Sequence, residues 1–84
     1  MHASYFFRIF NTNKSKIALI WNNNEYTYGA LYKKIVKTSL LINNHNINTG
    51  SVVILQGDFS LSTIALLFSL INKGCIIVPL TYLS

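Results

Sequence analysis

The sequence of 84 residues has little cysteine, proline or glycine, and each scarcity excludes a class of protein. Cys75 is the only cysteine, so a scaffold held together by disulfides is excluded. A structural zinc site is equally poorly supported, because such sites take four ligands and the chain adds only the distant His2 and His45. One proline and four glycines leave no flexible linker, so we expect a single small domain at most.

Acidic side chains are scarce as well, and this scarcity explains most of the net charge of +5. Glu25 and Asp58 are the only acids, against seven lysines and arginines. The bases are spread over several segments and form neither a basic run nor an RNA-binding motif. We therefore expect a weakly basic, solvated face and no nucleic-acid partner.

Charged residues make up only 11% of the chain, whereas apolar residues make up 51% and the mean hydropathy is +0.39. This composition excludes intrinsic disorder, which requires few apolar residues and much charge. It is also apolar for a small soluble domain, which must carry a large polar surface. The chain therefore either covers apolar surface with a partner or is part of something larger. The apolar N-terminal stretch is short and broken by Arg8, so it does not resemble a secretory signal, and we expect a cytoplasmic location.

The segment 61–83 is mostly apolar and about as long as a membrane span of roughly 20 residues. Its midpoint carries Asn72, Lys73 and Gly74, which place an amide, a charge and a helix stop where hydrocarbon would be. We therefore expect two elements of ordinary length and no membrane partner. A small membrane-associated protein that uses residues 61–83 stays open as an alternative.

The first half of the sequence predicts two helices and a hairpin. A short helix is expected over 3–11, and two strands at 16–21 and 25–28 flank a turn of three asparagines. Thr27 suits the N-cap of a helix over 28–43. The apolar face of that helix is predicted to hold Ala30, Leu31, Ile35, Thr38, Leu41 and Ile42, and its opposite face Lys33, Lys34 and Lys37.

The second half predicts a β-α-β unit with parallel strands at 52–56 and 75–79 and a helix over 60–73. Ser60 or Ser62 is expected to cap the helix, and Gly74 to end it in a left-handed conformation. The strands are apolar throughout, which indicates a sheet covered on both faces, although the chain offers cover for only one. The fold class is α/β: an N-terminal β-hairpin plus a βαβ unit, in which 1–84 is one partial domain without a second domain.

The helix over 60–73 is apolar on nearly every side. We expect it to leave apolar surface uncovered and to promote self-association of the isolated chain. The residues that lead to this expectation are Leu61, Ile64, Leu66, Leu67, Phe68, Leu70 and Ile71.

Three stretches carry a resemblance to a known family. Residues 26–31 read Tyr-Thr-Tyr-Gly-Ala-Leu at the start of the long helix, and residues 50–55 read Gly-Ser-Val-Val-Ile-Leu. Residues 71–80 read Ile-Asn-Lys-Gly-Cys-Ile-Ile-Val-Pro-Leu. In this order and spacing, over about 16–81, they resemble the N-terminal segment of the adenylate-forming (AMP-binding) superfamily, which includes acyl-CoA synthetases and nonribosomal-peptide adenylation domains.

Three positions depart from the family pattern. Ala30 stands where the family has a glutamate that would complete a capping box with Thr27. Ser51 replaces an aspartate, and Lys73 replaces a small residue before the glycine. These positions serve capping and packing, so the departures weaken the local structure and do not bear on chemistry.

The resemblance implies a parent ligase that joins a carboxylic acid to ATP, giving an acyl-AMP and pyrophosphate. The acyl group then passes to a thiol such as coenzyme A or a carrier protein. The family's phosphate loop, ribose-binding acid and hinge-domain lysine lie further along, so this segment is expected to be an inactive scaffold. Whether the chain acts as an enzyme stays open. ATP and magnesium are expected only for a full-length parent, and the expected partner is the rest of that ligase. A free-standing small α/β protein with a binding or relic role is the alternative.

We assign no catalytic, cofactor-binding or metal-binding residue, because each reactive side chain has a plainer interpretation. The turn at 57–60 has one glycine and no following lysine, so we interpret it as a strand-to-helix turn. The other interpretations are a solvated loop residue for His45, a buried thiol for Cys75, a turn or cap for Asp58, a hairpin position for Glu25, hydroxyls without a partner histidine for Ser60 and Ser62, and cross-strand packing for Tyr26 and Tyr28.

Overall fold

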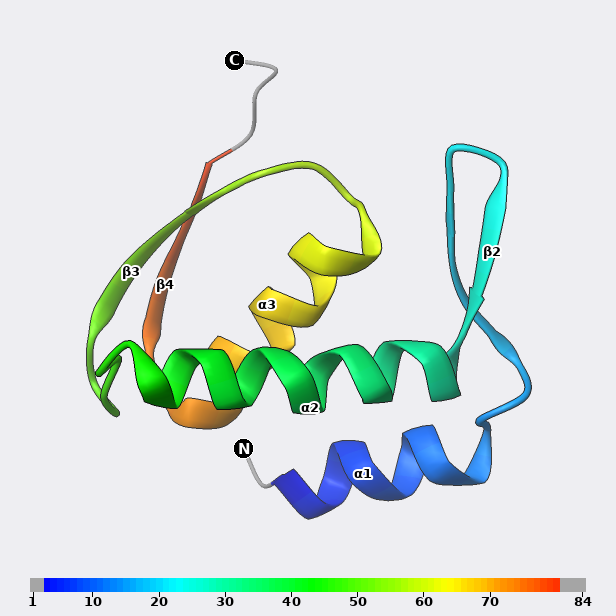
Figure 1. The fold of residues 1–84 in the computed structure, drawn as a ribbon, viewed down its shortest axis with the longest axis horizontal. Helices are drawn as coiled ribbons and strands as arrows, with labels where there is room; N and C mark the ends of the chain where they lie inside the picture. The colour runs from blue at the N-terminus through cyan, green and yellow to red at the C-terminus, as the bar shows by residue number, and fades with distance from the viewer. Residues whose placement is uncertain (1–2, 81–84) are drawn as a thin grey trace.

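The computed structural model describes residues 3–80 of the chain, with the side chains of residues 8–80. Figure 1 shows helix α3 between a hairpin, β1–β2, and a parallel strand pair, β3–β4, with α2 and α1 along their base. This α/β arrangement is the one that the sequence predicts. The elements in chain order are α1 (Ala3–Thr12), β1 (Ile17–Trp21), β2 (Asn24–Thr27), α2 (Tyr28–Asn44), β3 (Val52–Gln56), α3 (Leu61–Lys73) and β4 (Ile76–Leu80).

The hairpin owes its tight turn to asparagine. Asn22 and Asn23 have φ angles of 52° and 64°, a left-handed conformation that asparagine tolerates well. Two successive positive φ angles are typical of the type I′ turn, whose twist matches that of antiparallel strands. β1 and β2 pair antiparallel, as predicted, and β2 leads directly into α2. The hydroxyl of Thr27 accepts a hydrogen bond from the N–H of Ala30 at 3.1 Å, which confirms Thr27 as the N-cap.

Helix α2 buries Leu31 and Ile42, whereas Leu41 is 58% exposed. The prediction that Leu41 shares the core face was therefore wrong. Leu31 and Ile42 are eleven residues apart, so three helical turns bring them to nearly the same angle, whereas Leu41 is rotated by about 80°. Ile42, and not Leu41, therefore lies on the buried face at this end of α2.

The parallel pair has the predicted order and direction. Val52 pairs with Ile76 at one end, and Gln56 pairs with Leu80 at the other. The connecting helix α3 begins at the N-cap Ser60 and ends at Gly74, whose φ is 84°. Both caps match the sequence analysis. Because α3 ends at Lys73 and a strand follows, no helix within residues 3–80 is long and apolar enough to cross a membrane.

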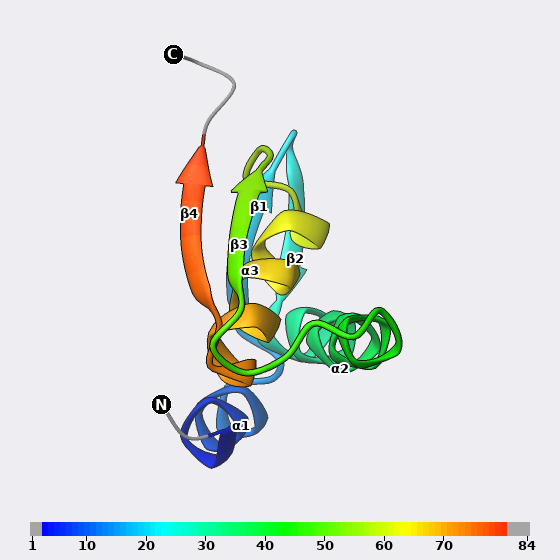
Figure 2. The same cartoon turned by 90° about the vertical axis from the view of Figure 1, so that its left-hand side faces the viewer.

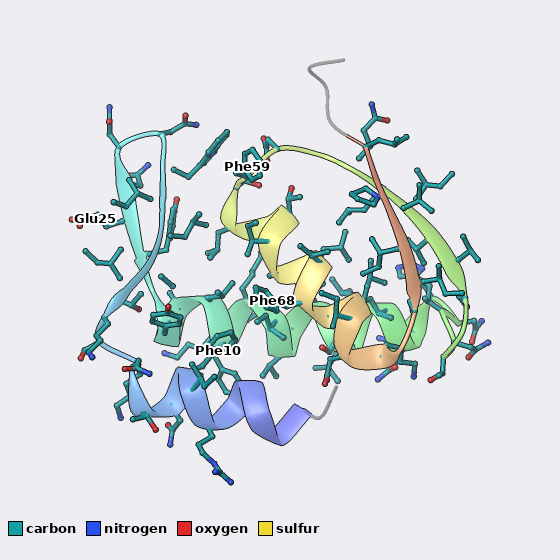
Figure 3. The ribbon with its side chains drawn as sticks, turned by 180° about the vertical axis from the view of Figure 1, so that it is seen from behind. Phe10, Glu25, Phe59 and Phe68 are labelled. Carbon is teal, nitrogen blue, oxygen red and sulfur yellow. The ribbon has the colours of Figure 1, made fainter. Side chains whose placement is uncertain are left out.

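The core sits where the three helices meet. Phe10, Leu31 and Ala65 form its centre. The Phe10 ring lies 5.5 Å from the ring of Tyr28 and 5.8 Å from the ring of Phe68, measured between centroids (Figure 3). The ring of Phe68 stands edge-on to that of Phe10, an orientation that favours aromatic attraction. Phe10 thus joins α1 to both other helices.

Small side chains let α2 and α3 approach closely. Ser69 is 2% exposed, and its hydroxyl donates to the carbonyl of Ala65 at 2.7 Å. The same oxygen lies 3.2 Å from the backbone carbonyl oxygen of Ile35 on α2, so almost nothing separates the two helices here. Ala65, one helical turn earlier, is completely buried. A larger side chain at either position would separate the helices.

The exposed apolar surface does not lie on α3, and that prediction was wrong. Ser62 and Asn72 are the only exposed residues of α3. The helix is covered because α2 packs along one side of it and the β3–β4 pair along another. Uncovered apolar side chains are found instead on the strands, with Val52 at 65% and Ile54 at 66% exposure.

Candidate functional site

The N-terminal end of α3 is the natural place to look for a site, because ligands of α/β proteins bind at the carboxyl ends of parallel strands. The turn from β3 into α3 starts at Gly57, which lies against Thr63. A Cβ atom at position 57 would lie 2.9 Å from the hydroxyl oxygen of Thr63, closer than real contacts allow. A side chain at position 57 would therefore displace that of Thr63.

The polar groups of this turn satisfy one another. A carboxylate oxygen of Asp58 accepts from the backbone N–H of Ser60 at 3.0 Å and from the hydroxyl of Thr63 at 3.3 Å. The hydroxyl oxygens of Ser60 and Thr63 lie 3.2 Å apart, and that of Ser60 accepts from the Thr63 N–H at 3.4 Å. The carboxylate thus provides the negative charge that a helix N-terminus attracts. The geometry is that of a strand-to-helix cap.

The pKa of the Asp58 carboxyl is lowered from its ordinary value of 3.8. The largest cause is a hydrogen bond from the Ser60 side chain, and the next is the hydrogen bond from the Ser60 backbone N–H, because both favour the charged carboxylate. A carboxyl whose folded pKa is lowered stabilises the fold fully above its unfolded pKa. That contribution disappears as the pH falls through the folded value. The contribution of Asp58 is therefore complete at neutral pH and is lost only below about 3.8.

We predict that Asp58→Asn removes this loss of stability in acid, because the amide oxygen still accepts hydrogen bonds but does not titrate. The free energy of unfolding, measured by urea denaturation from pH 7 down to about pH 2, is the test. The control is Glu25→Gln, which neutralises the exposed acid of the hairpin. This variant should still lose the stability contributed by Asp58 when the pH is lowered. If the free energy of unfolding of the wild type and of Asp58→Asn fell in parallel as the pH was lowered, the role assigned to the Asp58 carboxylate would be contradicted.

The other candidates lie in ordinary structural positions. His45 is exposed at the C-cap of α2, where its N–H donates to the carbonyl of Leu41 at 3.0 Å. Cys75 is half-buried just before β4, and its sulfur lies 3.6 Å from the carbonyl oxygen of Asn48. Glu25 is exposed on the hairpin and points away from the helices (Figure 3). These observations match the solvated and hairpin interpretations of His45 and Glu25, while Cys75 is less buried than predicted because it precedes the strand.

Tyr28 does not lie on a strand. It is the first residue of α2, and its ring packs on Phe10 of α1, so the predicted cross-strand packing was wrong for Tyr28. A helix start rotates the side chain out of the alternation of the strand. In the part of the chain that the structure describes, histidine, cysteine and acidic side chains form no group of three that could hold a metal ion.

An open groove of about 360 Å³ between α2 and α3 escaped the sequence analysis. Its size lies within the range of small-molecule clefts. The one signal for it was Leu41, which lies beside the apolar stripe of α2 and forms part of the wall. The lining contains two basic side chains and no acid: Lys34, Thr38, Leu41, Ile42, His45, Ile47, Ser62 and Leu66.

Comparison with solved structures finds close likeness in fold. The N-terminal subdomain of NpsA from Klebsiella oxytoca matches with a TM-score of 0.88 at 21% identity, over 96% of this chain and 21% of that chain. NpsA–ThdA, an artificially fused adenylation–PCP di-domain from the same organism, matches with a TM-score of 0.83 at 22% identity, over 93% of this chain and 15% of that chain. VinN matches with a TM-score of 0.86 at 15% identity, over 100% of this chain and 23% of that chain.

No family model and no curated protein sequence matches the chain. At the identities found, the structural likeness establishes the fold: that of part of the N-terminal subdomain of adenylation domains such as NpsA. This confirms, for the fold, the resemblance drawn from the three sequence stretches. The chain spans about a fifth of the length of the solved structures that it matches.

Proposed function

We propose that this chain is the opening segment of an adenylate-forming ligase and serves as scaffold in its N-terminal domain. The parent joins a carboxylic acid to ATP, releases pyrophosphate, and passes the acyl group from acyl-AMP to a thiol such as coenzyme A or a carrier protein. One observation carries the proposal. The fold of nearly the whole chain matches the N-terminal subdomain of NpsA.

The described residues support a scaffold role. The N-terminus of α3, where the helix dipole favours an anion, is already occupied by the carboxylate of Asp58, which repels other anions. Activation of a carboxylate by ATP requires positive charge or metal ions around the triphosphate. ATP and magnesium therefore belong to the rest of the proposed ligase, whose remaining segments are the expected partner in the cytoplasm.

A free-standing small α/β protein is the second candidate, and the core of the structure favours it. Phe10, Leu31 and Ala65 form a buried cluster joining three helices. Two of these helices carry complete N-caps, at Thr27 and Ser60. A segment with its own core and caps has the local features of an independently folding unit.

The size of the native polypeptide separates the two candidates. An antibody raised against residues 43–50, which lie mostly exposed between α2 and β3, is used on extracts of the source cells. The ligase proposal expects a band several times heavier than 9.5 kDa, because the chain spans about a fifth of the matched structures. A single band at 9.5 kDa that captures no ligase segment would favour the free-standing protein.

A further inference from the structure

The open groove of about 360 Å³ between α2 and α3 has walls that this chain supplies itself. The two helices touch where the Ser69 hydroxyl oxygen lies 3.2 Å from the carbonyl oxygen of Ile35, and the groove lies beside this contact. Figure 2 looks nearly along α2 and shows α3 inclined to it, and helices that cross at an angle diverge away from their contact. The groove therefore follows from how the two helices pack, and none of the residues that line it belongs to a strand.

One stripe along α2 forms the longer wall of the groove. Four of its side chains follow one another at intervals of three or four residues, about one helical turn each: Lys34, Thr38, Leu41 and His45. At a rise of 1.5 Å per residue, this stripe is about 16 Å long. Such a wall suits an elongated ligand.

Most of the remaining lining is aliphatic. Ile42 of α2, Ile47 of the following loop and Leu66 of α3 face the groove together with Leu41. Leu41 is 58% exposed, so it keeps apolar surface that a ligand in the groove would cover. Removing such surface from water is favourable. The groove therefore fits an apolar chain.

The charged and titratable side chains of the groove are all bases. Lys34 is half-buried, and neither acid of the chain lines the groove. Glu25 lies on the hairpin, and the carboxylate of Asp58 is held by the N–H of Ser60. An ammonium beside aliphatic walls attracts a negatively charged group and repels a cation, and the net charge of +5 acts in the same direction.

We propose that the groove between α2 and α3 binds an amphipathic anion. Its apolar chain lies along Leu41 and Leu66, and its negatively charged head lies at Lys34. The Thr38 hydroxyl already donates to the carbonyl of Lys34 at 2.7 Å, so recognition of the head falls to the Lys34 ammonium. The proposal goes beyond the proposed function, because it concerns a ligand of this chain by itself and does not require a longer ligase.

Octyl phosphate, kept below the concentration at which it forms micelles, is the probe. It is titrated into the isotope-labelled full chain while the amide chemical shifts are followed by NMR. Saturable shifts centred on α2, the following loop and α3 are expected. The absence of saturable shifts would overturn the proposal, and so would shifts centred on the exposed aliphatic side chains of β3 and β4.

Three further compounds separate the contribution of the head from that of the chain. Octyl glucoside has a neutral head and octyltrimethylammonium a cationic one, and both should bind about fivefold more weakly than octyl phosphate, or weaker still. Inorganic phosphate should give no saturable shifts, because it lacks the apolar chain. Equal affinity for the three octyl compounds, or binding of inorganic phosphate as tight as that of octyl phosphate, would overturn the proposal.

Lys34→Gln removes the positive charge and should raise the Kd for octyl phosphate by about fivefold, while the Kd for octyl glucoside stays the same. Lys37→Gln is the matched control, because it changes the net charge equally on the same helix but lies outside the groove. Its Kd for octyl phosphate should be close to that of the wild type. Equal weakening by the two variants would overturn the placement of the head at Lys34, and the proposal with it.

Leu41→Asn tests the apolar wall and should raise the Kd for octyl phosphate by about fivefold. Leu40→Asn is the matched control, since Leu40 is 60% exposed against 58% for Leu41, but only Leu41 lines the groove. Circular dichroism checks that both variants remain folded, and Leu41→Ala with Leu40→Ala replaces a pair that does not. The same Kd for both members of a folded pair would overturn the proposal.

Discussion

Phe10→Ala is expected to lower the free energy of unfolding by about 3–5 kcal/mol, the usual range for a buried phenylalanine. Phe10 is 4% exposed and packs on Tyr28, Phe68 and the core around Leu31. Alanine leaves a cavity at the junction of α1, α2 and α3, which the rigid helices fill only in part. The stability of a domain this small is of similar size, so the variant should be largely unfolded.

Phe59→Ala is the matched control, because it removes the same side chain from an exposed position. Phe59 is 65% exposed, and its ring meets Trp21 at a centroid distance of 6.4 Å (Figure 3). Its loss should cost about 1 kcal/mol or less. Urea denaturation followed by circular dichroism compares the two variants at one protein concentration, since any self-association would make the measured stability depend on concentration. Similar losses for both variants would contradict the placement of the core.

Ser69→Leu is expected to lower the free energy of unfolding by about 2–3 kcal/mol, by overpacking the contact between α2 and α3. The Ser69 hydroxyl oxygen lies 3.2 Å from the carbonyl oxygen of Ile35, so three added carbon atoms force the helices apart. The displacement also disturbs Ala65, which has no exposed surface in the same contact. Thermal and urea denaturation measure the effect.

Ser69→Ala separates the effect of size from that of the hydroxyl group. Alanine removes the hydrogen bonds to Ala65 and Ile35 but adds no volume, and the net contribution of such a bond is about 1 kcal/mol. Alanine also favours the helix, which offsets part of this loss. A Ser69→Leu variant as stable as Ser69→Ala would show that α2 and α3 are not closely packed at this point.

The features predictable from sequence were those with local causes. Asn22 and Asn23 tolerate positive φ, Thr27 and Ser60 offer oxygens to backbone N–H groups, and Gly74 adopts the left-handed cap. Each of these effects acts within a few residues, so the sequence alone is sufficient. The parallel pairing followed because two short apolar strands enclose a helix long enough for a crossover.

The errors concern contacts between distant segments. Leu41 and Ile42 are adjacent in sequence, and only the position of α3 decides which one is buried. The cover of α3 depends on α2 and the strand pair, and periodicity within α3 does not reveal their positions. Tyr28 meets Phe10 because α1 folds back against α2. The candidate residues did not form a site in either the sequence or the structure, so the function rests on likeness in fold.

ATP–pyrophosphate exchange tests the central claim, that this chain is a scaffold segment of an adenylate-forming ligase. It is measured on the purified chain and on the native polypeptide captured by the antibody against residues 43–50. The account predicts carboxylate-dependent exchange by the native polypeptide and none by the chain alone. In the described part of the chain, histidine, cysteine and acidic side chains form no group that could hold a metal ion, and the Asp58 carboxylate already occupies the N-terminus of α3. ATP-dependent exchange by the purified chain, or its absence from the native polypeptide with every carboxylic acid supplied, would contradict the account.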